Sequence, residues 1–229
     1  MTELNGPRVG PEASGAPRQL VVLCHGLGAD GNDLIDIASA WKQAVPHAAF
    51  VAPDAPFPCD MAPPGENYGR QWFSVTDRTP VAMEQGVSRA AGYLDAFIDA
   101  ELSRLSLAPD AYALMGFSQG AMTALFAGLR RTVKPRAILA YSGALIAPKQ
   151  LLERLSGGPA RVPVLLIHGE DDEVVPVSRS RDAETALRAA GVPVESLYCP
   201  RLGHGIDQAG LSVGALFLQR AFSAQAGGQ

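Results

Sequence analysis

The chain contains 229 residues with a formal net charge of −4, and 47% of its residues are apolar while 18% are charged. A chain of this length buries roughly 70% or more of the surface that it would expose unfolded, which excludes intrinsic disorder over most of its length. An acidic balance without a long basic run attracts phosphate backbones only weakly, so we expect no nucleic-acid partner.

The sequence shows no signal for insertion into a membrane or for export. No stretch reaches the roughly 18 consecutive apolar residues of a bilayer span, so no transmembrane segment is expected. Residues 1–17 contain glycine and proline at intervals but no apolar core, and we interpret them as a flexible N-terminal segment and not a signal peptide. A cytoplasmic location is the default expectation. Cys24, Cys59 and Cys199 lack the paired spacing of a zinc or redox site, so we expect free thiols and no metal.

Short apolar runs alternate with longer amphipathic runs along the chain, a pattern typical of βαβ units on a mostly parallel sheet. Strands are expected where the apolar run is nearly continuous, over residues 20–24, 49–52, 111–115, 137–141, 162–168 and 194–198. Helices are expected where apolar residues recur every three or four positions, over residues 81–105, 121–129, 179–190 and 206–222. The sequence therefore predicts an α/β fold with helices on both faces of the sheet.

Residues 53–80 fit neither pattern, because prolines alternate there with bulky apolar side chains. We expect a long loop that packs against the body of the protein, since loops of this length are usually functional or disordered. No second domain is visible. The prediction is one domain over residues 18–224, followed by a frayed tail at residues 225–229.

The strongest chemical signal is the pentapeptide Gly-Phe-Ser-Gln-Gly at residues 116–120. It matches G-x-S-x-G and lies between an expected strand and an expected helix, the context that this motif requires. The glycines let strand and helix approach closely, so that Ser118 occupies a sharp turn at the N-terminus of a helix, where negative charge is stabilised. Ser118 is the expected nucleophile; the alternative is a structural serine between two turn glycines.

A serine nucleophile needs an adjacent base, and the chain has four histidines to supply it. His25 and His168 each end an expected strand, a setting in which the ring more often packs structurally, and His47 lies in a predicted surface turn. His204 lies in a loop between the last expected strand and the last expected helix, which alone gives the chain order serine, acid, histidine. His204 is the expected base, against the alternative of a solvated loop histidine.

The acid should follow the expected strand at residues 162–168, where residues 170–173 read Glu-Asp-Asp-Glu. Four neighbouring carboxylates cannot all be buried beside one imidazole, so most of them must be solvated. Spacing alone leaves Asp171 and Asp172 as equal candidates.

Ester hydrolysis also needs N–H donors aimed at the oxyanion. The Gln119 amide, directly after the serine, supplies one, and the glycine-rich turn at residues 24–31 allows the Leu27 amide to supply the other. The same turn has the G-x-G-x-x-G spacing of a dinucleotide-binding fingerprint. We discount that interpretation because no acidic residue follows at the end of a second strand.

A series of short motifs carries a resemblance to a known family, at residues 25–31, 53–56, 72–73, 116–120, 142–143, 168–176 and 203–204. On these motifs the chain resembles the phospholipase/carboxylesterase family of α/β-hydrolases over about residues 19–222. The resemblance implies an α/β-hydrolase fold with a mostly parallel sheet. It also selects Asp172 as the acid, because the family's acid stands four residues after the strand-ending histidine.

The resemblance further implies roles for residues around the nucleophile. Leu27 and Gln119 would donate the two oxyanion-hole amides, and Trp72, Leu145 and Val174 would contact the substrate. Residues 61–70, and Ser74 where many relatives have aspartate, depart from the family's pattern and leave the acyl-chain preference open.

These features predict a serine carboxylesterase that hydrolyses a small-molecule ester through an acyl-enzyme on Ser118, without cofactor or metal. One alternative is an acyl-protein thioesterase or lysophospholipase that acts on long acyl chains with the same triad. Another is a catalytically inert scaffold that binds a ligand. A dienelactone-type hydrolase is disfavoured, since those enzymes have cysteine as the nucleophile. A homodimer through the proline-rich loop or the last helix is a further hypothesis.

Overall fold

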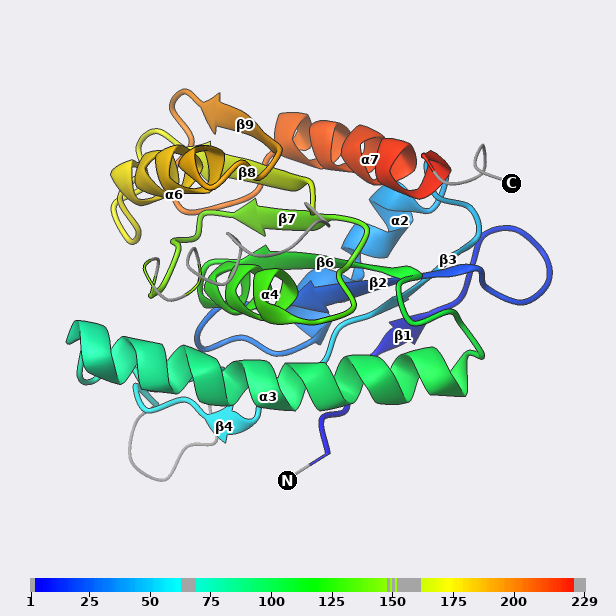
Figure 1. Cartoon of the computed structure of the whole chain (residues 1–229), viewed down its shortest axis with the longest axis horizontal. Coiled ribbons are helices and arrows are strands. Elements are labelled where there is room, and N and C mark those ends of the chain that lie inside the picture. The colour runs from blue at the N-terminus through cyan, green and yellow to red at the C-terminus, as the bar shows by residue number, and fades with distance from the viewer. Residues whose placement is uncertain (1–2, 63–68, 148, 150, 152–161, 225–229) are drawn as a thin grey trace.

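A seven-stranded sheet forms the centre of the molecule (Figure 1). The computed structural model describes residues 3–62, 69–147, 149, 151 and 162–224. The strands are, in spatial order, β1 (Arg8–Val9), β3 (Ala48–Val51), β2 (Gln19–Cys24), β6 (Tyr112–Phe117), β7 (Ile138–Tyr141), β8 (Val164–Gly169) and β9 (Val194–Cys199). β1 is antiparallel to β3, and each of the other neighbouring pairs is parallel. This is the mostly parallel sheet that the sequence predicts.

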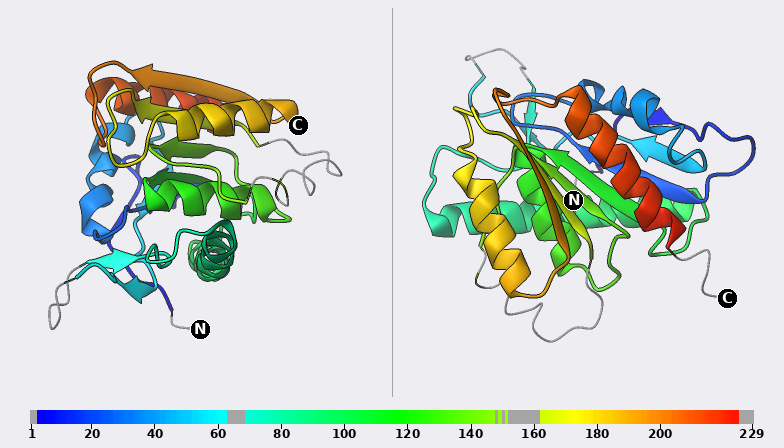
Figure 2. Two further views of the ribbon diagram at one scale, coloured as in Figure 1. Left: turned by 90° about the vertical axis from the view of Figure 1, so that its left-hand side faces the viewer. Right: turned by 90° about the horizontal axis from the view of Figure 1, so that it is seen from above.

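Helices cover both faces of the sheet (Figure 2). One face packs against α3 (Pro80–Arg104), α4 (Gln119–Arg130) and α6 (Ser178–Ala189), and the other against α1 (Asn32–Ile35), α2 (Ile37–Trp41) and α7 (Gln208–Ser223). Alternate residues of β2 point to opposite faces: Leu20 and Val22 join the first core, whereas Val21 and Leu23 join the second. Because both faces are buried, the strands are nearly continuous apolar runs.

The expected strands and long helices are present, but the sequence patterns missed the short elements. α1 and α2 have only four and five residues, too few for an apolar period to emerge. Within the loop expected at residues 53–80, β4 (Phe57–Pro58) pairs antiparallel with β5 (Arg70–Gln71). This segment therefore contains a small two-stranded sheet.

Residues 8 and 9 form an edge strand, which corrects the expectation of flexibility at this point of the N-terminal segment. β1 pairs with β3, and Arg8 Nη2 lies 2.6 Å from Glu101 Oε1 on α3. Local composition could not indicate this order, because both partners lie far along the chain. Residues 225–229, expected to fray, lie outside the described residues.

Glu101 is the buried end of this contact. Its side chain is 4% exposed and accepts hydrogen bonds from Arg8 and Arg104. Burial raises the pKa of the Glu101 carboxyl, but the two arginines outweigh burial and hold it below its ordinary value. The ionised carboxylate therefore stabilises the fold above about pH 4.3, and this contribution is lost as the pH falls through the lower pKa of the folded protein.

We expect Glu101→Gln to lower the free energy of unfolding by about 1–2 kcal/mol at about pH 7, because it replaces charge-assisted hydrogen bonds to partly exposed arginines. The difference from wild type should shrink as the pH falls below the ordinary pKa of a glutamate and the wild-type carboxylate takes up a proton. Urea unfolding at a series of pH values from about 7 downward measures this difference in the free energy of unfolding. Glu12→Gln is the control, since Glu12 forms an exposed pair with Lys42 and its loss should change stability by less than about 0.5 kcal/mol. Equal losses in the two variants would contradict the role of Glu101.

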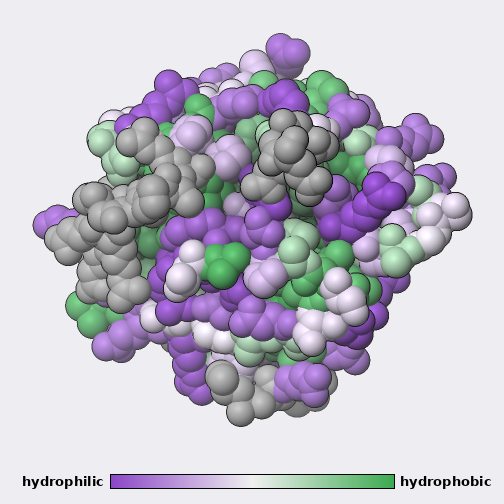
Figure 3. Space-filling model, turned by 45° about the vertical axis from the view of Figure 1, so that its right-hand side comes forward, coloured by the Kyte–Doolittle hydropathy of each residue, from purple (hydrophilic) through white to green (hydrophobic). Residues whose placement is uncertain are grey.

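No helix in the described part of the chain is long and apolar enough to cross a membrane. On the face that Figure 3 displays, hydrophobic residues appear in small groups separated by hydrophilic ones, between the grey regions. The homodimer stays a prediction.

Candidate active site

Ser118 lies at the bend between β6 and α4. Its backbone has φ 53° and ψ −117°, a conformation that residues with side chains rarely adopt and that costs of order 1–3 kcal/mol. The Ser118 amide donates to the Tyr141 carbonyl at 2.9 Å, and the residue is 8% exposed. The bend thus fixes the serine at the N-terminal end of α4.

Two glycines make this bend sterically possible. A Cβ at Gly120 would lie 2.0 Å from the Cys24 carbonyl oxygen, and a Cβ at Gly116 would lie 2.3 Å from the Gly120 carbonyl oxygen. Only glycine lets the backbones of β2, β6 and α4 approach so closely. This is the packing that the G-x-S-x-G context predicts.

Asp172 follows β8 and is 7% exposed. Its Oδ1 accepts hydrogen bonds from the amides of Val174 and Val175 at 2.9 and 2.8 Å, and its Oδ2 lies 2.7 Å from His204 Nδ1. Burial raises the pKa of the Asp172 carboxyl, but the hydrogen bonds from His204 and the two amides outweigh burial, so the net pKa is lowered. The carboxylate is therefore ionised at neutral pH.

The neighbouring Asp171 differs from Asp172 in its surroundings. Asp171 is exposed, and within the described residues its carboxylate has no hydrogen-bond or ion-pair partner, whereas its amide donates to the Leu202 carbonyl. Tertiary contacts therefore distinguish the two carboxylates that spacing left equal.

His204 lies in the loop between β9 and α7, next to the serine bend. Its ring packs on Phe117, with centroids 4.8 Å apart, and its side chain is 17% exposed. Nδ1 faces Asp172, which leaves Nε2 as the second nitrogen. No hydrogen bond joins this ring to the Ser118 hydroxyl among the described residues; catalytic hydrogen bonds are often long before substrate binds. The structure thus brings Asp172, His204 and the serine bend to one edge of the sheet.

His168, at the end of β8, is a further contact of Asp172. Its Nε2 lies 3.1 Å from Asp172 Oδ2 and 2.8 Å from the Val175 carbonyl oxygen. Both neighbours are acceptors, so we place the proton on Nε2, and Nδ1 then accepts from the Ser180 hydroxyl at 2.7 Å. The sequence interpretation of His168 as a packed strand-end residue missed this contact. The four-residue spacing between His168 and Asp172 was the signal that could have found it.

His25 is buried under the serine bend. Its Nε2 accepts from the Ala55 amide at 2.9 Å, and its Nδ1 lies 2.7 Å from the Gly26 carbonyl oxygen. Burial lowers the pKa of His25, so the ring is neutral at neutral pH. It holds two loops together, in line with the structural role expected for it.

The turn after β2 lies against Ser118. A Cβ at Gly26 would lie 3.5 Å from the Ser118 Cβ, and Gly28 donates to the Arg70 carbonyl at 2.8 Å. Within the described residues, neither the Leu27 nor the Gln119 backbone N–H has a protein acceptor. Two unused donors therefore flank the serine.

The Gln119 side chain holds the loop that follows β5. Its Oε1 accepts from the Trp72 amide at 2.8 Å, and its Nε2 donates to the Phe73 carbonyl at 2.7 Å. Trp72 is 0% exposed, and its indole donates to the His25 carbonyl at 2.9 Å. The ring is thus buried among the loops that carry the site, because its large apolar surface packs there, and it does not line the cavity described below. Its contact with substrate stays a prediction.

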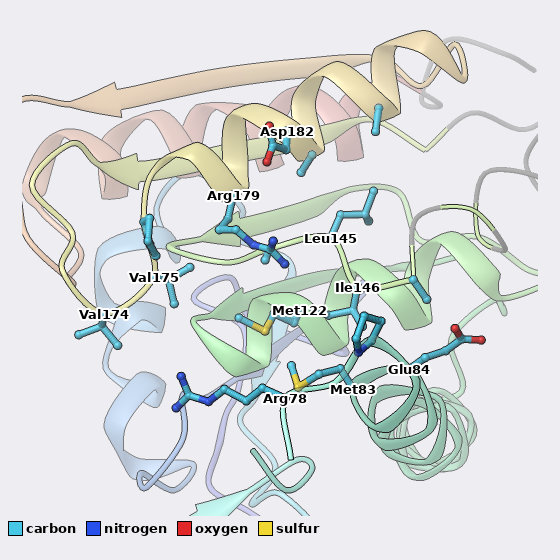
Figure 4. Close-up of a pocket in the computed structure, with 16 residues that line it drawn as sticks. Arg78, Met83, Glu84, Met122, Leu145, Ile146, Val174, Val175, Arg179 and Asp182 are labelled. Atoms are coloured by element: carbon cyan, nitrogen blue, oxygen red, sulfur yellow. The ribbon is translucent and has the colours of Figure 1, made fainter. Parts of the chain in front are cut away.

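A cavity of about 730 Å³ lies between α3, α4 and α6 (Figure 4). It adjoins the serine bend through Met122, whose amide donates to the Ser118 carbonyl, and it adjoins Asp172 through Val174 and Val175. Leu145 and Val174 line it, and their contact with substrate stays a prediction. The lining is mainly apolar, with four charged residues among it: Arg78, Glu84, Arg179 and Asp182.

The described residues contain neither a cluster of metal-ligating side chains nor a disulfide. Within the described ranges, no group of three or more histidine, cysteine or acidic side chains is arranged to hold a metal ion. The three cysteines are buried and unpaired, and burial raises the pKa of the Cys24 thiol.

Comparisons with known proteins agree with this architecture. The family model described as Phospholipase/Carboxylesterase matches residues 8–221. The chain is 31% identical to acyl-protein thioesterase 1 of Schizosaccharomyces pombe over 76% of each chain. It is 30% identical to a probable inactive carboxylesterase of Oryza sativa subsp. japonica, over 86% of this chain and 82% of that protein. The crystal structure of esterase PE8 matches 96% of this chain and 100% of its own, with 38% identity and a TM-score of 0.86. The chain therefore belongs to the phospholipase/carboxylesterase family of α/β-hydrolases and is an enzyme of the carboxylic ester hydrolase class.

Proposed function

We propose that this protein is a serine carboxylesterase that acts through an acyl-enzyme on Ser118. The observation that carries the proposal is the strained serine at the start of α4, beside a histidine whose Nδ1 contacts a buried carboxylate. A serine hydroxyl is a weak nucleophile until a base accepts its proton, and an imidazole held by a carboxylate is such a base.

The reaction runs in two halves. Ser118 Oγ attacks the ester carbonyl carbon while His204 Nε2 takes the hydroxyl proton, and the carbonyl electron pair moves to oxygen to give a tetrahedral anion. The anion collapses, the bond to the alcohol oxygen breaks, and His204 returns the proton to the leaving alcohol. Water then loses a proton to His204 and attacks the acyl-enzyme, and collapse releases the acid and restores Ser118.

Two further parts of the site support this chemistry. The Leu27 and Gln119 amides have no acceptor among the described residues and would donate to the tetrahedral oxyanion, a contribution worth about 2.7–4 kcal/mol of barrier per donor. Asp172, kept ionised by its contacts, would hold His204 in the tautomer with the proton on Nδ1 and stabilise the imidazolium.

The cavity beside the bend is the proposed site of the substrate's acyl chain. Its volume of about 730 Å³ lies within the usual range for small-molecule sites, and Leu145 offers an apolar surface to a hydrocarbon chain. A long-chain thioesterase is the second candidate, because the Schizosaccharomyces pombe relative is named as an acyl-protein thioesterase.

Covalent labelling by a fluorophosphonate probe tests the proposal, together with kcat/KM for p-nitrophenyl esters of increasing acyl length and for a palmitoyl thioester. We expect labelling and a maximum at short or medium chains, because the cavity has a limited volume of about 730 Å³. A rise through long chains, with rapid thioester cleavage, would favour the second candidate. A folded protein that neither labels nor turns over any ester would be an inert scaffold.

A further inference from the structure

Two exposed arginines line the mainly apolar cavity, together with the acidic residues Glu84 and Asp182. Arg78 precedes α3 and Arg179 lies in the first turn of α6, and both line the cavity with Met83, Met122 and Leu145. Figure 4 shows the Arg179 side chain extending from α6 into the space above α4, toward Met122 and Leu145. A guanidinium in this position faces whatever chain fills the cavity.

Within the part of the chain that the structure describes, Arg179 lacks the carboxylate partner that the other arginines of α6 have. Arg181 pairs with Glu170 at 2.9 Å, and Arg188 pairs with Glu184 at 2.7 Å. Arg179 forms no ion pair within 4.0 Å in the described part of the chain, and Arg78 contacts only the Val75 carbonyl there. Both cavity guanidiniums therefore keep donors for a ligand.

The two acidic residues that line the cavity form no ion pair with either arginine in the described part of the chain. Asp182 lies on α6 near Arg179, but its carboxylate stays beside the helix in Figure 4, and Glu84 points to the opposite end of the cavity. Neither forms an ion pair among the described residues. A guanidinium binds carboxylate and phosphate through paired, charge-assisted hydrogen bonds. The cavity thus combines an apolar surface for a chain with cations for an anion on it.

We propose that the enzyme prefers esters whose cavity-bound part carries an anionic group, a carboxylate or a phosphate, and that Arg179 binds this group. The anion belongs to the acyl side, as in half-esters of dicarboxylic acids, if the cavity holds the acyl chain as proposed above; it belongs to the alcohol side, as in acylated glycerol phosphates, if the cavity holds the alcohol instead. The inference rests on the proposed esterase function.

The test compares kcat/KM for mono-p-nitrophenyl adipate and p-nitrophenyl hexanoate, which share a leaving group and a chain length and differ in the distal carboxylate. A second pair, 1-hexanoylglycerol 3-phosphate and 1-hexanoylglycerol, places the anion on the alcohol side. In at least one pair we expect wild type to have the higher kcat/KM for the anionic ester. Arg179→Gln should lower the ratio of kcat/KM for the anionic ester to kcat/KM for the neutral ester by about tenfold, because KM for the anionic ester rises. The pair that responds identifies the side of the ester that carries the anion.

Arg181→Gln is the matched control, because Arg181 lies on the same helix, pairs with Glu170 and does not line the cavity. It should leave both ratios unchanged, and Arg179→Lys should restore part of the preference, since it keeps the charge but loses the paired geometry. Ratios that change by less than about twofold in Arg179→Gln would overturn the inference. Failure of wild type to cleave any of the four esters would instead remove the proposed function itself.

Discussion

The Ser118→Ala variant is expected to lose esterase activity by about 10³- to 10⁶-fold in kcat. The hydroxyl oxygen is the atom that bonds to the acyl group, and the remaining site offers only the oxyanion donors and the cavity. The variant should lose fluorophosphonate labelling together with ester turnover, because the probe reacts with the same Ser118 hydroxyl oxygen. Stopped-flow or endpoint release of p-nitrophenol from a short ester measures the loss.

Ser142→Ala provides a matched control for the Ser118 variant. Ser142 also has a positive φ, 49°, at the end of the neighbouring strand β7. Its hydroxyl is buried without a hydrogen-bond partner in the described residues, so its removal should leave kcat within a few-fold of wild type. Thermal melts should show both variants folded. Near wild-type turnover in Ser118→Ala would refute the nucleophile assignment.

The Asp172→Asn variant is expected to lower kcat by about 10⁴-fold with little change in fold. Asparagine keeps an oxygen for the Val174 and Val175 amides, but its NH₂ group would face His204 Nδ1. The ring would then lose its acceptor on that side and take the tautomer that has no lone pair on Nε2 for the serine proton. Ester turnover at about pH 7 and above measures the effect, because the lowered pKa of Asp172 keeps the wild-type carboxylate ionised there.

Asp171→Asn is the control for the acid. Asp171 is exposed and its carboxylate is unpartnered in the described part of the chain, so its neutralisation should change kcat by less than about twofold. Equal losses in the two variants would indicate that the acidic run acts by its total charge, and a larger loss in Asp171→Asn would reverse the assignment. His168, which also contacts Asp172, stays intact in both variants.

The elements of this fold could be predicted because their signals are local. Residues 81–105 carry an apolar residue on every turn, and α3 occupies Pro80–Arg104. The G-x-S-x-G spacing likewise encodes its own bend, since the close approach of Gly120 to the Cys24 carbonyl requires glycine. The pairing of β1 with β3 could not be read in this way, because the residues that order Arg8 lie elsewhere in the chain.

By itself, the sequence determined the order along the chain of the long helices and of the strands β2, β3, β6, β7, β8 and β9, and the position of the serine bend. Spacing left two carboxylates as candidates for the acid, and the family resemblance selected Asp172. Only the tertiary structure decided that Asp172 receives the Val174 and Val175 amides and the His204 ring, that His168 contacts the same oxygen, and that Trp72 is buried and does not line the cavity. It also decided that Arg179 faces the cavity without a carboxylate partner in the described residues. The physical reason is the sequence separation over which each effect acts. Periodicity and glycine sterics depend on a few neighbouring residues, whereas the burial, ion pairing and pKa of a side chain depend on which distant elements pack together.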